Sequence, residues 1–324
     1  MHRVLIIGCG RIAGGFDEGD GGGVTVRTHA GAYRAHGGFS LAACVDPDRD
    51  RREAFAQHWG VAQAAATVSE LPAGKFDVVS ICSPTSAHGA DIAAALAFGP
   101  RLIFCEKPVS ESAAETEALI GRCANAGVRL AVNYTRRWAP DVVQLSRALG
   151  AGEWGAVRSV SGIYTKGAVH NGGHMIDLIH MLFGPVELVA AGPPVFDFRD
   201  DDPSVPALLR TAQGVPVTLA VGDARDYALF ELVVVTERGE IAMRDGGLAW
   251  TERRSGESEA FAGYRALGPF ESRAGRYDEA MPAAVADIAA ALHTGAPLAS
   301  TGETALAAQR VCEQMRDAAL SRTH

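Results

Sequence analysis

The chain has 324 residues, of which 48% are hydrophobic and 21% charged, and its formal net charge is −8. That length is long for a single hydrophobic core, so we expect two domains. The negative charge argues against nucleic-acid binding, which needs clustered Lys and Arg side chains. No apolar run approaches the roughly 20 residues that span a bilayer, and the N-terminus does not read as a signal peptide. We therefore expect a cytoplasmic protein that binds neither nucleic acid nor membrane.

Short apolar runs alternate with helical patterns over residues 1–132. Strands alternating with helices predict right-handed βαβ units and a doubly wound parallel sheet covered on both faces, which is an α/β fold. The expected strands are 4–7, 41–45, 78–82, 102–105 and 129–132. The expected helices are 30–35, 49–59, 90–98 and 113–126.

The pattern changes after residue 133, where consecutive strand-like runs are separated by tight glycine turns. This predicts an α+β domain over 133–324 with a large, mainly antiparallel sheet. The expected helices are 140–149, 174–183, 282–293 and 303–320. The expected strands are 157–164, 188–191, 207–211, 215–221, 230–236, 240–244 and 248–252. As hypotheses, the last helix packs back on the first domain, and one sheet face serves subunit contact.

Gly8-x-Gly10-x-x-Ala13 follows the first expected strand and precedes a helix. Gly8 permits the tight turn, Gly10 lets the backbone approach a pyrophosphate, and Ala13 allows close packing. The N-terminus of the following helix offers amide donors and positive potential to the phosphates. The motif alone is weak, but its place after a buried strand predicts a dinucleotide site that includes Arg11 and Ile12.

The second expected strand is followed by Asp46. A carboxylate there accepts hydrogen bonds from both hydroxyls of the adenosine ribose and repels a 2′-phosphate, so Asp46 favours NAD over NADP. Two alternatives stay open: Asp46 as the N-cap of the next helix, and use of NADP through Arg49. The glycine-rich segment Asp17–Gly23 is interpreted as an inserted mobile loop, or as a lid over the cofactor.

The third expected strand leads into Ser83, Pro84 and Thr85, with His88 shortly after. Cofactors lie at the strand ends of a doubly wound sheet, so we expect the first three residues to line the adenosine and ribose side. For His88 the sequence leaves a contact with the cofactor and a structural role open, because one histidine is weak evidence.

The fourth expected strand is followed by Glu106-Lys107-Pro108. Pro108 ends the strand, and Lys107 is then held at the carboxyl edge of the sheet. A lysine beside a nicotinamide can share a proton with a substrate hydroxyl. The alternative is a surface lysine paired with Glu106.

In the second domain, His174 begins an expected helix, and Asp177 one turn later shares its face. Asp177 would fix the imidazole tautomer of a catalytic His174, or merely complement the positive end of the helix. His170 and His174 have the spacing of metal ligands, but the two glycines between them argue against a helix there, and no metal is expected. Asn133, Tyr134 and Arg137 are expected to contact substrate, with an interdomain salt bridge as the alternative role of the arginine.

Together these segments resemble the Gfo/Idh/MocA family, the glucose–fructose oxidoreductase and inositol dehydrogenase group. The resemblance rests on the glycine turn, Asp46, Ser83-Pro84-Thr85 with His88, Glu106-Lys107-Pro108, and Gly172-x-His174-x-x-Asp177 followed by Leu182-Phe183-Gly184. It implies an N-terminal Rossmann domain and NAD(P)-dependent oxidoreduction of a sugar, cyclitol or related polyol. It also implies that Lys107 and His174 handle the proton, and that the protein is a homodimer or homotetramer packed through its sheets.

One position departs from this resemblance. Inositol dehydrogenase-like members carry Asp four residues before the catalytic His, where this chain has His170. Asn171 and the preceding Tyr164 and Lys166 resemble another subgroup, and these four residues are candidate substrate contacts. We expect an NAD-dependent dehydrogenase or reductase acting on a polyol or keto-sugar. The alternatives are a glycoside-cleaving enzyme that uses transient oxidation, and a non-catalytic NAD-binding regulator.

Overall fold

The computed structural model describes residues 1–18, 25–72 and 74–321, in two compact units. The first unit contains Met1–Trp138 and Asp278–Leu306, and the second contains Ala139–Tyr277 and the chain from Ala307 onward. The expected domain boundary at residue 132 stays a prediction. No described helix is long and apolar enough to cross a membrane. The segment Asp17–Gly23 lies outside the described residues from residue 19 on.

The first unit is built on a parallel six-stranded sheet in the order β3-β2-β1-β4-β5-β6. Its strands are β1 (His2–Ile7), β2 (Phe39–Val45), β3 (Gln63–Ala65), β4 (Val78–Ile81), β5 (Leu102–Cys105) and β6 (Arg129–Val132). Chain order reverses beside β1, the switch point at which doubly wound sheets bind ligands. The sheet confirms the α/β fold that the sequence predicts, and β3 is a short edge strand that the sequence does not predict.

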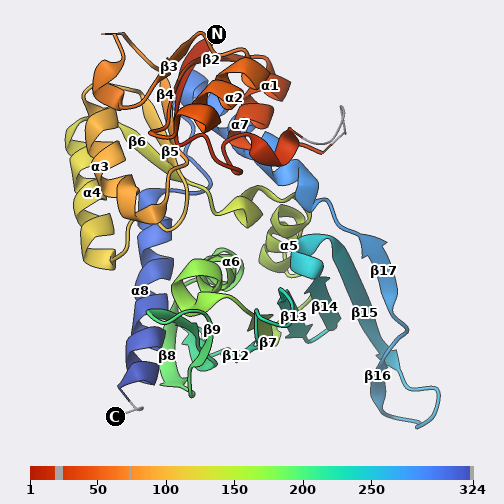
Figure 1. The fold of residues 1–324 in the computed structure, drawn as a ribbon. Coiled ribbons are helices and arrows are strands. Elements are labelled where there is room, and N and C mark those ends of the chain that lie inside the picture. The colour runs from red at the N-terminus through yellow and green to blue at the C-terminus, as the bar shows by residue number, and fades with distance from the viewer. Residues whose placement is uncertain (19–24, 73, 322–324) are drawn as a thin grey trace. The chain divides into compact units, whose positions relative to one another are not determined.

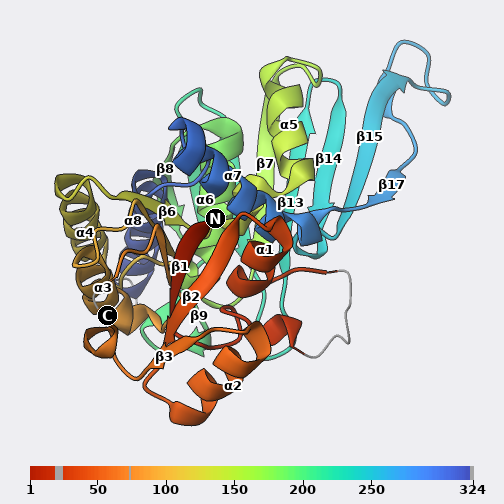
Figure 2. The ribbon, with the colours of Figure 1, turned by 90° about the horizontal axis from the view of Figure 1, so that it is seen from above.

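Helices cover both faces of this sheet. They are α1 (His29–His36), α2 (Arg49–Trp59), α3 (Thr85–Leu96), α4 (Ala113–Asn125) and α7 (Ala280–Thr294). Figures 1 and 2 show α3 and α4 on one face and α1, α2 and α7 on the other. The expected helix 90–98 begins earlier, at Thr85. Gly89 lies within this helix at a close contact with α4, where a Cβ would lie 2.6 Å from Glu115 Oε1.

The second unit contains a nine-stranded sheet in the order β16-β15-β14-β13-β7-β12-β11-β8, with β17 paired to β15. Only β7 with β12 is a parallel pair, so the sheet is mainly antiparallel as expected. The strands are β7 (Val157–Tyr164), β8 (Val186–Ala191), β11 (Ala207–Thr211), β12 (Pro216–Val221), β13 (Phe230–Thr236), β14 (Gly239–Arg244), β15 (Ala249–Glu257), β16 (Arg265–Leu267) and β17 (Glu271–Ala274). A separate hairpin joins β9 (Val195–Arg199) to β10 (Asp202–Ser204).

Residues in the central strands of this sheet alternate between buried and exposed, as in β11 and β12. Such alternation marks an antiparallel sheet with one covered face. The helices are α5 (Pro140–Gly150), α6 (Gly172–Phe183) and α8 (Gly302–Leu320), whose first residues belong to the first unit. Figure 1 shows β15 and β17 as the two arms of a long antiparallel hairpin. The six cysteines are buried and unbridged.

Candidate active site

The strand register brings the expected site residues of the first unit to one edge of its sheet. Ile7, at the end of β1, pairs with Val45 and Ile81, while Ile81 pairs with Cys105, and Cys105 with Val132. The carboxyl ends of these five strands therefore lie side by side at one edge of the sheet. The residues that follow them are the glycine turn, Asp46, Ser83, Glu106 with Lys107, and Asn133.

The glycine turn has the geometry that a pyrophosphate site needs. Gly8 has φ +87°, and a Cβ there would lie 2.5 Å from the backbone nitrogen of Ser83, so no side chain fits. At Gly10, by contrast, no protein atom lies within 4 Å of where a Cβ would stand. The backbone of the turn is thus open to a ligand on the Gly10 side. Ala13 is fully buried, as expected of the close-packing position.

One part of the expected phosphate site is wrong. The first amides of α1 do not point to a free N-terminus, because His29 N donates to Ile12 O at 3.2 Å and Ala30 N donates to Ala13 O at 2.9 Å. These two backbone hydrogen bonds join α1 to the glycine turn. Asp17 adds a third link, since its carboxylate accepts a 2.5 Å hydrogen bond from the hydroxyl of Thr28.

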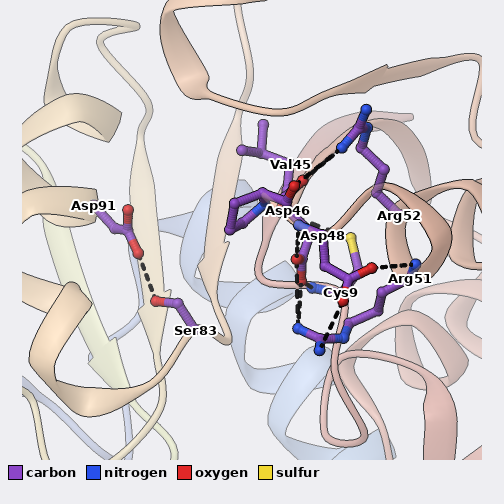
Figure 3. A network of polar contacts seen from close by, with 9 residues as sticks. Cys9, Val45, Asp46, Asp48, Arg51, Arg52, Ser83 and Asp91 are labelled. Carbon is purple, nitrogen blue, oxygen red and sulfur yellow. Dashed lines mark hydrogen bonds and ion pairs between the residues drawn. The ribbon is translucent and has the colours of Figure 1, made fainter.

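Asp46 is 3% exposed and links the glycine turn to the end of β2 (Figure 3). Its carboxylate accepts hydrogen bonds from Cys9 N at 2.8 Å and from Asp48 N at 2.9 Å. Arg51 Nη1 lies 3.4 Å from both oxygens. The N-cap role proposed as an alternative for Asp46 belongs to Asp48, which accepts from Arg51 N at 3.0 Å. Arg49 points instead to Glu53, at 2.7 Å.

Ser83 and His88 follow β4, and both make hydrogen-bond contacts within the protein. Ser83 Oγ donates to Asp91 at 2.5 Å (Figure 3), a partner that the sequence did not indicate. His88 is 1% exposed and lies between two carbonyl oxygens, 2.8 Å from Ser83 O and 2.9 Å from Pro108 O. Both ring nitrogens thus face backbone of the protein, which favours the structural role. Pro84 occupies the N-cap position of α3, and α3 begins at Thr85.

Burial raises the pKa of Asp91, and the hydrogen bond from Ser83 opposes that shift without reversing it. Through its contacts with Ser83 O and Pro108 O, His88 joins the chain after β4 to the chain after β5, next to Lys107.

Glu106 is held by two hydrogen-bond donors. His29 Nε2 lies 3.0 Å from Glu106 Oε1, and Asn133 Nδ2 donates to the same oxygen at 2.6 Å. Burial opposes ionisation of the carboxyl group, but these contacts and the charge of Lys107 outweigh it, and the pKa of Glu106 is lowered. Glu106, Lys107 and Asn133 are predicted site residues. His29, which lies just before the predicted helix 30–35, is not.

The remaining substrate candidates of the first unit lie in or beside a short 3₁₀ turn, Thr135–Trp138. Tyr134 is 2% exposed. Arg137 Nη1 donates to the carbonyl of Ala299 at 3.2 Å. Both side chains are therefore engaged in the packing of this unit as well.

In the second unit, His174 lies in the first turn of α6, half-buried, with its ring 6.5 Å from that of Phe230. Asp177 is 1% exposed on the same helix. A π-helical turn, Gly167–Asn171, precedes α6 and includes His170. No group of three or more potential metal ligands occurs in the part of the chain that the structure describes.

Two acidic residues of the β9–β10 hairpin hold that π-helical turn. Lys166 has φ +74°, a left-handed conformation, and its N donates to Asp197 Oδ2 at 2.7 Å. Asp202 accepts from the backbone nitrogens of Val169 and His170, at 2.8 and 2.9 Å. Neither aspartate is a predicted site residue, because the hairpin that carries them is not predicted from the sequence.

Tyr164 differs from its expected role in substrate binding. It is fully buried, its hydroxyl donates to Val205 O at 2.8 Å, and that hydroxyl accepts from Val205 N at 3.0 Å. Burial also raises its pKa. Tyr164 is therefore a core residue of the second unit, whereas Asn171 Nδ2 donates to Thr165 O at 2.8 Å and stays half-buried.

Comparison with known proteins gives this arrangement a context. Residues 2–134 match the Gfo/Idh/MocA model, described as an oxidoreductase family with an NAD-binding Rossmann fold. Inositol 2-dehydrogenase of Rhizobium meliloti (strain 1021) is 26% identical over 331 residues, which cover 94% of this chain and 93% of the relative. D-apiose dehydrogenase of Paraburkholderia graminis is 31% identical over 186 residues, covering 51% and 48%.

A solved structure shares the whole fold. The WlbA dehydrogenase from Bordetella pertussis, in complex with NADH and UDP-GlcNAcA, superimposes with a TM-score of 0.77. The match covers 99% of this chain and 97% of the other, at 18% sequence identity. At that identity the likeness concerns the fold, and it includes both units.

Proposed function

We propose that this chain, whose residues 2–134 match the Gfo/Idh/MocA model of NAD-binding oxidoreductases, transfers a hydride between NAD and a carbinol or keto carbon of a sugar, cyclitol or related polyol. Two relatives are named as dehydrogenases of inositol and of apiose, both polyhydroxylated compounds. One observation carries the proposal: the last residues of β1, β2, β4 and β5 pair with one another. This register brings Gly8, Asp46 and Lys107 to one edge of the sheet.

The residues at this edge fit the dinucleotide. The open backbone beside Gly10, with Arg11 and Ile12, is the proposed pyrophosphate site. Asp46 keeps lone pairs beyond its two backbone hydrogen bonds, and we assign these to the adenosine ribose. Ser83, Pro84 and Thr85 are proposed to line the adenosine side. When bound, NAD supplies the hydride acceptor or donor.

Lys107 and His174 are the proposed proton-handling residues. As hydride leaves a carbinol carbon, its oxygen gains alkoxide character, which an ammonium group stabilises. Lys107 donates a hydrogen bond to that oxygen, and His174 takes its proton or returns it in the reverse direction. Asp177 is proposed to orient the imidazole. The proposal requires Lys107 and His174 to reach one substrate oxygen.

The chain also offers groups for the other hydroxyls of a polyol. We assign this role to Lys166, His170 and Asn171, beside the π-helical turn that Asp197 and Asp202 hold, and to Asn133 and Arg137. A cationic and an imidazole group at this turn suit a substrate that carries several acceptor oxygens or a carboxylate.

The proposal is tested by incubating the purified protein with NAD and a panel of inositols, aldoses, uronic acids and glycosides. Appearance of reduced-cofactor absorbance with at least one compound is expected. Turnover of a glycoside without added cofactor would point to transient oxidation instead. Absence of NAD binding in a calorimetric titration would refute the function.

We also propose that two or four copies assemble through the sheet of the second unit. Apolar side chains on its strands are exposed, among them Val189, Leu208 and Val235, which are 44%, 41% and 36% accessible. Exposed apolar sheet positions of this kind suit a subunit contact. Light scattering that gives the mass of one chain would contradict this assembly.

A further inference from the structure

A row of buried polar groups lies behind Glu106. Tyr33 Oη lies 2.9 Å from Ser80 Oγ, Ser80 Oγ lies 3.3 Å from His29 Nδ1, and His29 Nε2 lies 3.0 Å from Glu106 Oε1. Tyr33, Ser80 and His29 are fully buried. They come from α1 and β4, whereas Glu106 follows β5, so the row connects three elements of the first unit.

The donor of the contact with Glu106 can be assigned. Because the pKa of Glu106 is lowered, its carboxylate is ionised at neutral pH and only accepts. His29 Nε2 therefore carries the proton of that contact, and His29 Nδ1 shares a hydrogen bond with the hydroxyl of Ser80. Burial raises the pKa of Tyr33, so its hydroxyl keeps its proton and bonds to Ser80. Every polar group in the row therefore has a partner.

His29 also touches the glycine turn. Its backbone nitrogen donates to Ile12 O at 3.2 Å, two residues beyond Gly10. The same residue thus contacts the proposed pyrophosphate turn through its backbone and Glu106 through its ring. Lys107, next in the chain, lies within electrostatic reach of Glu106 and lowers its pKa.

We propose that His29 is a positioning residue for Lys107: with Ser80 and Tyr33 behind it, its ring fixes the Glu106 carboxylate, and this carboxylate sets the orientation of the adjoining lysine. The inference rests on the proposed function of Lys107. The Glu106 carboxylate is contacted by His29 and Asn133 and interacts electrostatically with Lys107 and with the thiols of Cys82 and Cys105. Burial raises the pKa of both thiols, so they stay neutral and do not replace His29.

The chain permits a direct test without any substrate. It contains three lysines, Lys75, Lys107 and Lys166. Reductive methylation with ¹³C-formaldehyde keeps the charge of each amine and gives few NMR signals, of which a Lys107→Arg variant identifies one. In His29→Leu the Lys107 signal and its titration midpoint are expected to move, while those of Lys75 and Lys166 stay in place.

Two further variants separate positioning from a general loss of structure. His29→Gln keeps one donor for Glu106 and one acceptor for Ser80, so it should restore the Lys107 signal to that of the natural protein. His36→Leu, the same change at the exposed end of α1, should leave it unmoved. If His29→Leu does not fold, Ser80→Ala serves in its place, because it removes the hydroxyl that holds the His29 ring at Nδ1.

Activity supplies the second readout. In His29→Leu we expect kcat to fall about 10²-fold, with NAD affinity by calorimetry changed less than about threefold, and His29→Gln should recover most of the loss. An unmoved Lys107 signal in both His29→Leu and Ser80→Ala would overturn the inference, as would equal kcat values in His29→Leu and His36→Leu. If the natural protein binds NAD but oxidises no polyol, the proposed function fails while the NMR result still decides the role of His29.

Discussion

The carboxylate of Asp46 accepts a hydrogen bond from the backbone nitrogen of Cys9 at 2.8 Å. This contact ties the residue proposed to read the ribose to the middle of the turn proposed to hold the pyrophosphate. Asp46 is 3% exposed, and Arg51 lies 3.4 Å from it. An acid and a guanidinium thus stand together at the position that distinguishes NAD from NADP.

Replacing Asp46 by Ala should reverse the cofactor preference. NAD loses an acceptor for its ribose hydroxyls, and we expect its affinity to fall about tenfold or more. NADP should bind better than it does to the natural protein, because Arg51 is released to pair with the 2′-phosphate. Calorimetric titrations with both cofactors measure the change. Asp48→Ala, which removes the cap of α2, is the matched control and should preserve the preference for NAD.

The two glycines of the turn should respond differently to alanine. Gly8→Ala forces a Cβ to within 2.5 Å of Ser83 N at φ +87°, so stability should fall by about 2 kcal/mol or more. Gly10→Ala meets no protein atom within 4 Å, and its stability should stay within about 1 kcal/mol of the natural protein. Gly10→Ala should nevertheless lose NAD affinity, since the methyl group occupies the open side of the turn. Undiminished NAD binding by a folded Gly10→Ala variant would place the pyrophosphate elsewhere.

Glu106 should contribute stability that depends on pH. Its folded pKa is lowered from the ordinary value of 4.5, so the unfolded chain binds the proton more tightly. The contribution is therefore fully present above the unfolded pKa and is lost as the pH falls through the folded pKa. Urea unfolding of the natural protein and of Glu106→Gln should differ most near neutral pH and converge at acidic pH. A difference that grows on acidification would contradict the ionised state.

His88 should act mainly through stability. His88→Leu leaves the carbonyl oxygens of Ser83 and Pro108 without this partner in a buried place. We expect a loss of about 2 to 4 kcal/mol in urea unfolding, with little change in NAD affinity if the variant is studied below its unfolding transition. A large loss of NAD affinity at unchanged stability would instead favour a direct contact with the cofactor.

The sequence predicts the framework of the first unit well because its signals are local. Buried strands such as 102–105 and the helix 49–59 show clear periodicity, and the structure confirms these bounds. The rule that parallel strands end at one edge then brings Asp46 and Lys107 to the same side. By contrast, β3 and β10 are three residues long, so neither period nor propensity distinguishes them from loops.

Side-chain partners across the fold are harder to predict. His29 and Glu106 are 77 residues apart in the chain, and nothing local indicates that they meet. Tyr164 is a candidate substrate contact through the subgroup resemblance, yet it is buried and its hydroxyl donates to the carbonyl of Val205, directly after β10. Such pairings depend on how elements distant in sequence pack together, and a single sequence carries no signal for them.

The central claim is that the amine of Lys107 takes part in the chemical step. Lys107→Met keeps an unbranched side chain only one atom shorter but removes the charge and the transferable proton. With the polyol that the natural enzyme oxidises best, kcat/KM should fall at least about 10²-fold, while calorimetry should show NAD affinity within a few-fold of the natural value. A Lys107→Met enzyme that binds NAD and retains its kcat would contradict the account.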